Sequence, residues 1–233
     1  MVEKEIPSAM NRTEKDRQET HPPKNSWICE NEKTLLSSPV MELIERQCRS
    51  SEQTDHRLKF YLLRSKDWCN IIPITEDGKI VMVKQYRIGV SKHTLEIPGG
   101  VIDPEDEHYQ AAAIRELQEE TGYMPLPGAQ CLNLGWVFPN PAIMDNRCHS
   151  YVIGPVRKNA PQNLDPGEMI EVVEVPIMEI PEKILNGEVS HSLMLNTFFL
   201  LALQSHRTSH FLIEALNRFA RPVPTTPESL SKN

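Results

Sequence analysis

The sequence predicts an α/β sandwich in which one dominant helix lies among β-strands and further helices follow them. Strand-like runs, rich in β-branched and aromatic residues, recur from about residue 57 and are separated by turn-forming residues. One segment with helical periodicity, residues 110–121, interrupts these runs. Because strands and helices do not alternate regularly, the pattern disfavours a βαβ array.

The expected strands are short, as is usual for strands in globular domains. The segment TEDGK, residues 75–79, predicts a turn between two of them. In chain order the predicted strands cover residues 58–64, 70–75, 79–88, 94–100, 130–138, 149–156 and 169–177.

The dominant helix is expected to end at Gly122, because glycine readily takes the left-handed conformation of a helix C-cap. Residues 181–188 and 191–205 are predicted as later helices. The predicted organisation is a flexible N-terminal extension over 1–38, one domain over 39–205, a C-terminal helix over 206–221 and a flexible tail over 222–233.

Composition and charge narrow the classes of function. The 233 residues are 39% hydrophobic and carry a net charge of −7, which disfavours nonspecific binding to nucleic acid or to an anionic membrane. The five cysteines form no CxxC pair, so a zinc cluster or a disulfide framework is not expected. The first residues lack the apolar run of a signal peptide, and we expect a soluble protein of the cytoplasm.

The segment RELQEETGY, residues 115–123, places three carboxylates on one helix face: Glu116, Glu119 and Glu120. A solvated charged face is the common explanation for such a cluster. Here the charges lie near the helix C-terminus, where the helix dipole disfavours anions, and no lysine follows four residues later. A hard divalent cation, Mg²⁺ or Mn²⁺, would account for such uncompensated oxygen ligands.

The segment EHYQAAAIRELQEETGY, residues 107–123, resembles the Nudix box, whose pattern is G-x5-E-x7-R-E-U-x-E-E-x-G-U with U apolar or aromatic. Glu107 and the positions from Arg115 onward match this pattern. The leading glycine should stand at position 101, which is Val101, so the loop before the helix carries one extra residue. Glu105 or Asp106 could therefore take the place of Glu107.

This resemblance implies a mixed-sheet α/β/α sandwich and hydrolysis of a nucleoside diphosphate linked to another group. It implies that Arg115 braces Glu119, and that four groups hold divalent ions: the Gly100 carbonyl, Glu116, Glu119 and Glu120. Such ions would neutralise a pyrophosphate and activate the attacking water.

Other segments resemble the branch of the family that hydrolyses ADP-ribose and nucleoside diphosphate sugars. In KQYRIGVSKHTLEIPGG, residues 84–100, the likeness implies that Arg87 contacts the pyrophosphate and that Glu96 supports the metal site or the substrate. A surface ion pair is the alternative for Arg87. Pro139 stands sixteen positions after Tyr123, a placement that is associated with ADP-ribose hydrolases. Asn140 and Arg147 follow as candidate donors to ribose, sugar or phosphate.

A catalytic base is expected on a loop beyond the box, within NLDPGEMIEVVEVP, residues 163–176. Glu168, which follows Pro166 and Gly167, is the first candidate, with Asp165 and Glu171 as competitors. In other relatives a glutamate of the box takes the proton, which here would be Glu116.

The sequence thus predicts a Mg²⁺- or Mn²⁺-dependent hydrolase whose partner is a small nucleoside diphosphate substrate. Two alternatives are a hydrolase of dinucleoside polyphosphates or oxidised nucleoside triphosphates, and a non-catalytic nucleotide-sensing module. Relatives in this branch often form homodimers in which N-terminal strands help to complete the partner's site. Residues 58–74 are a candidate segment for such a homodimer, and the sequence leaves the oligomeric state open.

Overall fold

The structure is a computed structural model that describes residues 23–204 of the chain. These residues divide into two compact units at the bond between Arg64 and Ser65. The predicted C-terminal helix over 206–221, the tail over 222–233 and residues 1–22 of the predicted extension lie outside the described residues.

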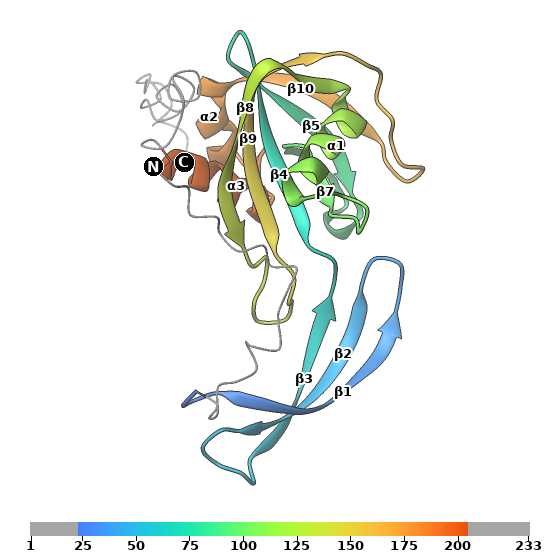
Figure 1. The fold of residues 1–233 in the computed structure, drawn as a ribbon, viewed down its shortest axis with the longest axis vertical. Helices are drawn as coiled ribbons and strands as arrows, with labels where there is room; N and C mark the ends of the chain where they lie inside the picture. Colours follow the sequence, from blue (N-terminus) through green and yellow to red (C-terminus); the bar gives the residue numbers. More distant parts are fainter. Residues whose placement is uncertain (1–22, 205–233) are drawn as a thin grey trace. The chain divides into compact units, whose positions relative to one another are not determined.

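The first unit is a three-stranded antiparallel sheet in the order β1-β2-β3 (Figure 1). Its strands are β1 (Trp27–Ser37), β2 (Glu42–Ser50) and β3 (Arg57–Arg64). The predicted flexible extension over 1–38 is wrong for residues 27–37, which form β1. Almost every side chain of β1 is exposed, so backbone pairing with β2 and not burial holds this strand, and no alternation of apolar residues marks it.

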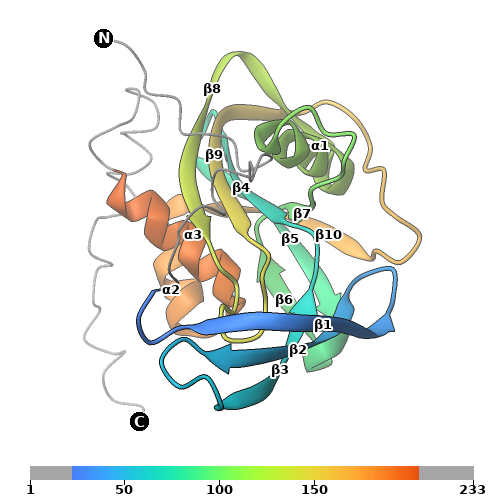
Figure 2. The same cartoon turned by 60° about the horizontal axis from the view of Figure 1, so that its bottom comes forward.

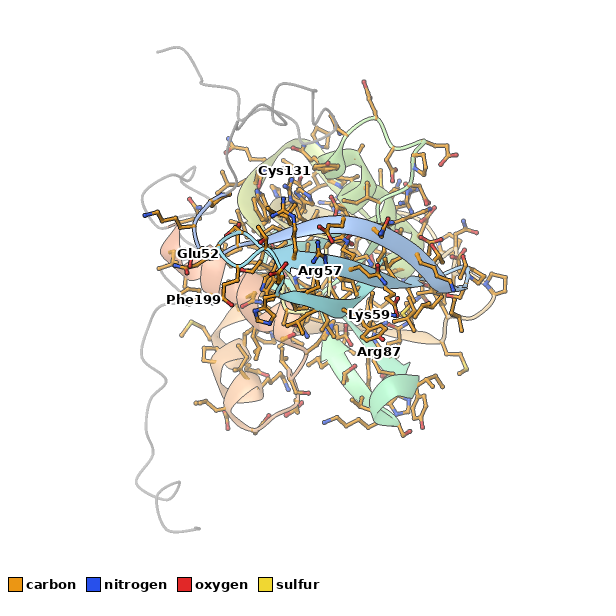
Figure 3. The ribbon with its side chains drawn as sticks, turned by 90° about the horizontal axis from the view of Figure 1, so that it is seen from below. Glu52, Arg57, Lys59, Arg87, Cys131 and Phe199 are labelled. Atoms are coloured by element: carbon orange, nitrogen blue, oxygen red, sulfur yellow. The ribbon has the colours of Figure 1, made fainter. Side chains whose placement is uncertain are left out.

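Charged side chains form ion pairs across these strands. Arg57 lies 3.1 Å from Glu30 and Lys59 lies 2.9 Å from Glu45; Figure 3 shows both basic residues on β3. Glu45 lies on the adjacent strand β2, diagonally across from Lys59, whereas Glu30 lies on β1, two strands away from Arg57. Because the basic side chains are exposed, such ion pairs add little to the stability of the sheet.

The second unit contains a mixed sheet with the central order β10-β5-β4-β9-β8; β6 pairs with β5 and β7 pairs with β4. The β4–β9 pair is parallel, whereas the other strands pair in antiparallel fashion. This confirms the predicted mixed sheet. The strands are β4 (Trp68–Thr75), β5 (Lys79–Arg87), β6 (Lys92–Glu96), β7 (Gly99–Val101), β8 (Tyr123–Val137), β9 (Cys148–Lys158) and β10 (Ile170–Pro176).

Helices cover both faces of this sheet, which confirms the predicted sandwich (Figures 1 and 2). Helix α1 (Tyr109–Thr121) packs on one face, and α2 (Ile180–Leu185) and α3 (Ser192–Leu203) pack on the other. The central strand β4 is buried on both sides: Cys69 and Ile71 join the α1 core, whereas Ile72 and Ile74 join the α3 core. Single 3₁₀ turns, η2 (Ile88–Val90) and η3 (Ile177–Glu179), follow β5 and β10.

Both ends of α1 are fixed by local chemistry. His108 Nδ1 accepts a hydrogen bond of 3.0 Å from the Ala111 amide, which caps the first turn. Gly122 ends the helix at φ +74°, as predicted, and a Cβ atom there would lie 2.0 Å from the Ala160 carbonyl oxygen. The register of the acidic residues on α1 is therefore set from both ends.

In the described part of the chain, no helix has the length and hydropathy needed to cross a lipid bilayer.

Candidate active site

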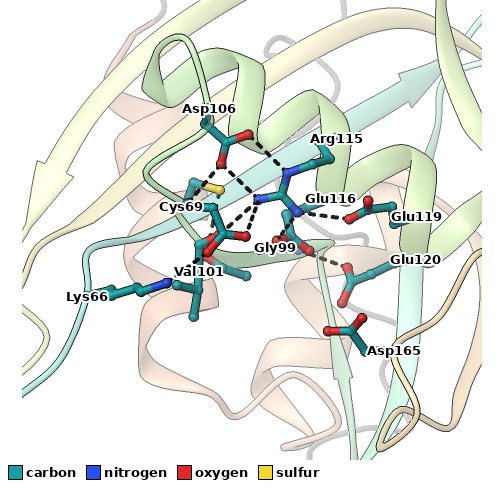
Figure 4. A network of polar contacts seen from close by, with 12 residues as sticks. Lys66, Cys69, Gly99, Val101, Asp106, Arg115, Glu116, Glu119, Glu120 and Asp165 are labelled. Carbon is teal, nitrogen blue, oxygen red and sulfur yellow. Dashed lines mark hydrogen bonds and ion pairs between the residues drawn. The ribbon is translucent and has the colours of Figure 1, made fainter. Parts of the chain in front are cut away.

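Arg115 lies at the centre of the acidic cluster on α1 (Figure 4). Its Nη1 donates to Glu116 Oε1 at 2.9 Å and to Glu119 Oε2 at 2.8 Å. Its Nε and Nη2 donate to the two carboxylate oxygens of Asp106 at 3.0 and 2.9 Å. The contact between Arg115 and Glu119 is the one that the sequence predicted, and one guanidinium holds three carboxylates in fixed positions.

Of the two candidates before the helix, Asp106 and not Glu107 receives hydrogen bonds from Arg115. The Asp106 side chain is 8% exposed, and hydrogen bonds from Arg115 lower its pKa below the ordinary value. Glu107 is exposed. Gly100 and Asp106 therefore have the spacing of the leading glycine and first glutamate of the box, and the extra residue lies between Asp106 and Arg115.

Two adjacent glycines let the strand β7 lie close to both helix α1 and strand β4. A Cβ atom at position 100 would lie 2.6 Å from the Glu116 carboxyl group, and one at position 99 would lie 2.3 Å from the Cys69 carbonyl oxygen. The Gly99 amide donates to Glu120 Oε2 at 2.9 Å. The sequence pattern required one glycine here, whereas the packing requires both.

Burial dominates the electrostatics of this cluster. It raises the pKa of Glu116 to about 7, against the opposing effect of the Arg115 charge. It also raises the pKa of Glu120, which is only 3% exposed, well above the ordinary value. The negative charge of Glu168 shifts both groups in the same direction. These glutamates are thus held together at an electrostatic cost that a bound cation would remove.

The described residues contain no three His, Cys, Asp or Glu side chains that are arranged to hold a metal ion as they stand. The hydrogen bonds explain this, because Glu119 is turned to Arg115 and Glu120 to the Gly99 amide. The donor set still fits a hard divalent cation, since it consists of oxygen atoms whose negative charge is partly buried and incompletely compensated.

A cavity of about 780 Å³ opens beside Gly99 and Gly100. Arg87 and Glu96 lie in its wall, and the Glu96 side chain is 1% exposed. The Arg87 guanidinium donates two hydrogen bonds to the Glu96 carboxylate, from Nε at 2.8 Å and from Nη2 at 2.7 Å. Although burial raises the pKa of Glu96, hydrogen bonds from Arg87, His191 and Thr94 bring it below the ordinary value. Glu96 is therefore an anion within the wall of the cavity.

The family of this chain follows from how much of its length a family model matches. The NUDIX domain model matches residues 68–197, which are more than half of the 233-residue chain. The chain belongs to the Nudix family.

Individual relatives match the Nudix domain at moderate identity. The chain is 35% identical to the methanol dehydrogenase activator of Bacillus methanolicus over 113 residues, which are 47% of this chain and 57% of that protein. It is 29% identical to the ADP-ribose pyrophosphatase of Bacillus subtilis strain 168 over 120 residues, which are 51% of this chain and 63% of that protein. The chain thus covers less than two thirds of the length of these relatives.

A solved structure supports the Nudix fold independently. A crystal structure of an ADP compounds hydrolase superposes with a TM-score of 0.66, covering 79% of this chain and 96% of that chain. The two sequences are 20% identical in this alignment, so the likeness concerns the fold.

Other predicted site residues of the Nudix domain lie in the connection between β8 and β9, and they do not line the cavity beside Gly100. Pro139 and Asn140 lie near the start of this connection, and the Asn140 carbonyl oxygen accepts from the amides of Ile143 and Met144. The Arg147 guanidinium lies over the Trp136 ring, 4.5 Å from its centroid. Pro139, Asn140 and Arg147 are therefore not among the residues that line the cavity with Arg87, although the Arg147 carbonyl accepts a hydrogen bond from the amide of Trp68, which does line it.

The predicted candidates for the base lie in the loop between β9 and β10 or at its end. The Asp165 amide donates to Glu168 Oε2 at 3.1 Å, and Figure 4 shows Asp165 on the Glu120 side of the network. Glu171 lies 3.5 Å from Lys84 and is turned to the surface, with 67% of its side chain exposed. The charge of Glu168 raises the pKa of both Glu116 and Glu120, so Glu168 interacts electrostatically with the acidic cluster.

Sequence reasoning missed His191 and Thr94, which contact Glu96 at 3.2 and 2.5 Å. Thr94 and Glu96 are two positions apart in β6, so their side chains lie on the same face of the strand. This spacing is visible in the sequence and could have predicted their contact. His191 comes from the start of α3 and is far from Glu96 in the chain, so no local spacing links the two.

Proposed function

We propose that this protein is a divalent-metal-dependent hydrolase that splits ADP-ribose or a nucleoside diphosphate sugar into a nucleoside monophosphate and a sugar phosphate. Water adds across the P–O–P bridge, so that each product leaves with one phosphate. The main support is a pair of carboxylates, the partly buried Glu116 and the buried Glu120, that lie against the Gly99–Gly100 strand at the edge of a cavity with an arginine in its wall.

In this proposal the acidic residues hold the metal ion and Arg115 positions two of them. Glu116, Glu119, Glu120 and the Gly100 carbonyl would hold Mg²⁺ or Mn²⁺, which neutralises the diphosphate and acidifies the attacking water when it is bound. Arg115, anchored on Asp106, fixes the directions of Glu116 and Glu119.

Arg87 would bind the diphosphate, since its guanidinium is 43% exposed and lies in the cavity wall. Glu168 would accept the proton of the attacking water. It lies on the loop before β10, which leaves it free to approach the cluster when substrate is bound. Glu116, whose pKa is raised to about 7, is the alternative acceptor.

The choice of substrate is supported by a relative. The Bacillus subtilis relative is an ADP-ribose pyrophosphatase. A cytoplasmic location and a homodimer remain predictions from the sequence.

The test is a substrate panel with product identification. The purified full chain is incubated with ADP-ribose, several nucleoside diphosphate sugars, diadenosine tetraphosphate and an oxidised nucleoside triphosphate, with Mg²⁺, Mn²⁺ or EDTA. We expect AMP and ribose 5-phosphate from ADP-ribose with either metal, and no product with EDTA.

Release of a monophosphate from the dinucleoside or oxidised substrate alone would replace the proposed substrate class. Tight binding of ADP-ribose without turnover at any metal concentration would indicate the non-catalytic sensing module. The intact set of box glutamates argues against that module.

A further inference from the structure

Each oxygen atom of the Glu96 carboxylate has two polar side-chain atoms within 3.2 Å. Oε1 accepts from Arg87 Nε at 2.8 Å and from Thr94 Oγ1 at 2.5 Å. Oε2 accepts from Arg87 Nη2 at 2.7 Å and lies 3.2 Å from His191 Nδ1. Arg87 thus occupies one donor position on each oxygen, and two other residues stand at the second positions.

His191 Nδ1 is not used in any other way. It is buried, and within the described residues it makes no hydrogen bond of good geometry, although it lies within reach of Glu96. His191 is also the N-cap residue of α3, yet its side chain makes no capping bond. His108, the N-cap residue of α1, does cap its helix through the same nitrogen atom. The His191 ring is therefore turned from the helix that it begins toward Glu96.

This arrangement matters if Arg87 has to move. Glu96 is 1% exposed, so a departing guanidinium would leave a buried carboxylate without its main partner, which is strongly unfavourable. With Thr94 on Oε1 and His191 on Oε2, each oxygen keeps one donor when Arg87 leaves. Nδ1, in the tautomer that carries the ring proton on this atom, can then donate to Oε2 at the position that Arg87 Nη2 vacates.

We propose that His191 is a positioning residue that holds the Glu96 carboxylate and thereby frees Arg87 to bind a ligand phosphate in the cavity. This inference rests on the proposed function, since it needs an anionic ligand there. His191, Arg87 and Glu96 all line the same cavity, so the exchange takes place where the ligand binds.

The first experiment compares substitutions of His191 in the full chain with ADP-ribose and Mg²⁺. We expect His191→Ala to raise KM by about tenfold, the range for a lost hydrogen bond to a charged group, with kcat changed by less than about threefold. His191→Asn should recover most of this loss, because its Nδ2 can donate from nearly the position of the imidazole Nδ1.

His93 offers a matched control. It is a histidine on β6 that is exposed and packs its ring against Tyr86. His93→Ala should leave KM unchanged. Thermal unfolding of each variant separates a local effect from a loss of fold, and we expect midpoints close to that of the wild type.

A double-mutant cycle tests the route through Arg87. If His191 acts by releasing Arg87, then His191→Ala should have little further effect in an Arg87→Ala background. Equal effects of His191→Ala in both backgrounds would overturn the inference. So would a wild-type KM for His191→Ala, or a failure of His191→Asn to recover binding.

The same cycle measured by calorimetry, with Ca²⁺ replacing Mg²⁺, reports the Kd of ADP-ribose without turnover. A wild type that binds but hydrolyses no substrate refutes the proposed function, and the binding cycle still decides the role of His191. A wild type that hydrolyses normally, with a Kd unaffected by His191→Ala, refutes the inference alone. A wild type that neither binds nor hydrolyses ADP-ribose refutes both.

Discussion

Gly100 and Glu116 are packed so closely that a Cβ atom at position 100 would lie 2.6 Å from the Glu116 carboxyl group. Real Cβ atoms essentially never make contacts this short, so any side chain at position 100 would displace either the strand β7 or the glutamate. The contact joins the strand that borders the cavity to the helix that carries the acidic cluster. The position of a proposed metal ligand therefore depends on the lack of a side chain in another element.

Gly100→Ala should lower kcat by about a hundredfold, because a displacement of about 1 Å in a catalytic group has an effect of this size. It should also destabilise the fold by about 1–3 kcal/mol, as overpacking does. Urea unfolding and steady-state kinetics measure the two effects. The control is Glu116→Ala, which removes the clashing carboxyl group. If Gly100→Ala destabilises the Glu116→Ala background as strongly as the wild type, the clash is not with Glu116.

Asp106→Ala and Glu107→Ala form a matched pair that tests which acid anchors Arg115. Asp106 receives two hydrogen bonds from the guanidinium, so its loss should cost about 1.5–3 kcal/mol of stability and reduce activity. Glu107 is exposed, and its replacement should be within about 0.5 kcal/mol of neutral. Denaturant unfolding of both variants gives the answer. A larger loss for Glu107→Ala would restore the spacing of the family pattern as the correct assignment.

Asp106 and Glu107 also show which part of the site the sequence alone did not predict correctly. Counting back from Arg115 along the family pattern gives Glu107, because the pattern allows no extra residue between this glutamate and the arginine. In the structure Arg115 binds Asp106 instead, because the loop that follows Gly100 places the Asp106 carboxylate within reach of Nε and Nη2. The shared face of Glu116, Glu119 and Glu120 was predictable from helical geometry, as was the cap at Gly122. The contact between Glu96 and His191 was not, since it joins β6 to the start of α3 through tertiary packing.

The same contrast holds for the fold. Strands β4, β5 and β9 were predictable because their apolar runs are buried. The strand β1 escaped prediction because its side chains are mostly exposed and charged residues interrupt it. Its partner β2 was missed as well, although Ile44 and Cys48, four positions apart and on the same face of the strand, are buried. Pairing between strands, which no local pattern encodes, defines this unit.

Stability without metal should fall as the pH rises toward neutrality. Burial raises the pKa of Glu116 to about 7, whereas an unfolded glutamate titrates near 4.3. Between these values the folded protein holds a proton that the unfolded chain has released, so the free energy of unfolding is highest below about pH 4.3 and decreases up to about pH 7. For this shift the decrease is about 4 kcal/mol.

Glu116→Gln should remove most of this decrease and stabilise the metal-free protein at pH 7. Thermal unfolding from pH 5 to pH 8 in EDTA measures the slope, and the same series with Mg²⁺ should be flatter if the ion binds the cluster. A slope that is the same in Glu116→Gln and in the wild type would show that other groups cause it; Glu120, whose pKa is shifted in the same direction, would be the next to replace.

Glu168→Gln should lower kcat by about 10²–10⁴-fold with little change in KM, the effect of removing a general base that does not bind the substrate. The reason is its position on the loop before β10, from which its charge acts on both Glu116 and Glu120. Glu171→Gln is the matched control, because Glu171 is turned to Lys84 at the surface and should be dispensable. Steady-state kinetics with ADP-ribose across a pH range should also show that the activity of Glu168→Gln rises at alkaline pH, as hydroxide replaces the base.

Full activity in Glu168→Gln together with a large loss in Glu171→Gln would transfer the role to Glu171. Full activity in both would leave Asp165 and Glu116 as the remaining acceptors.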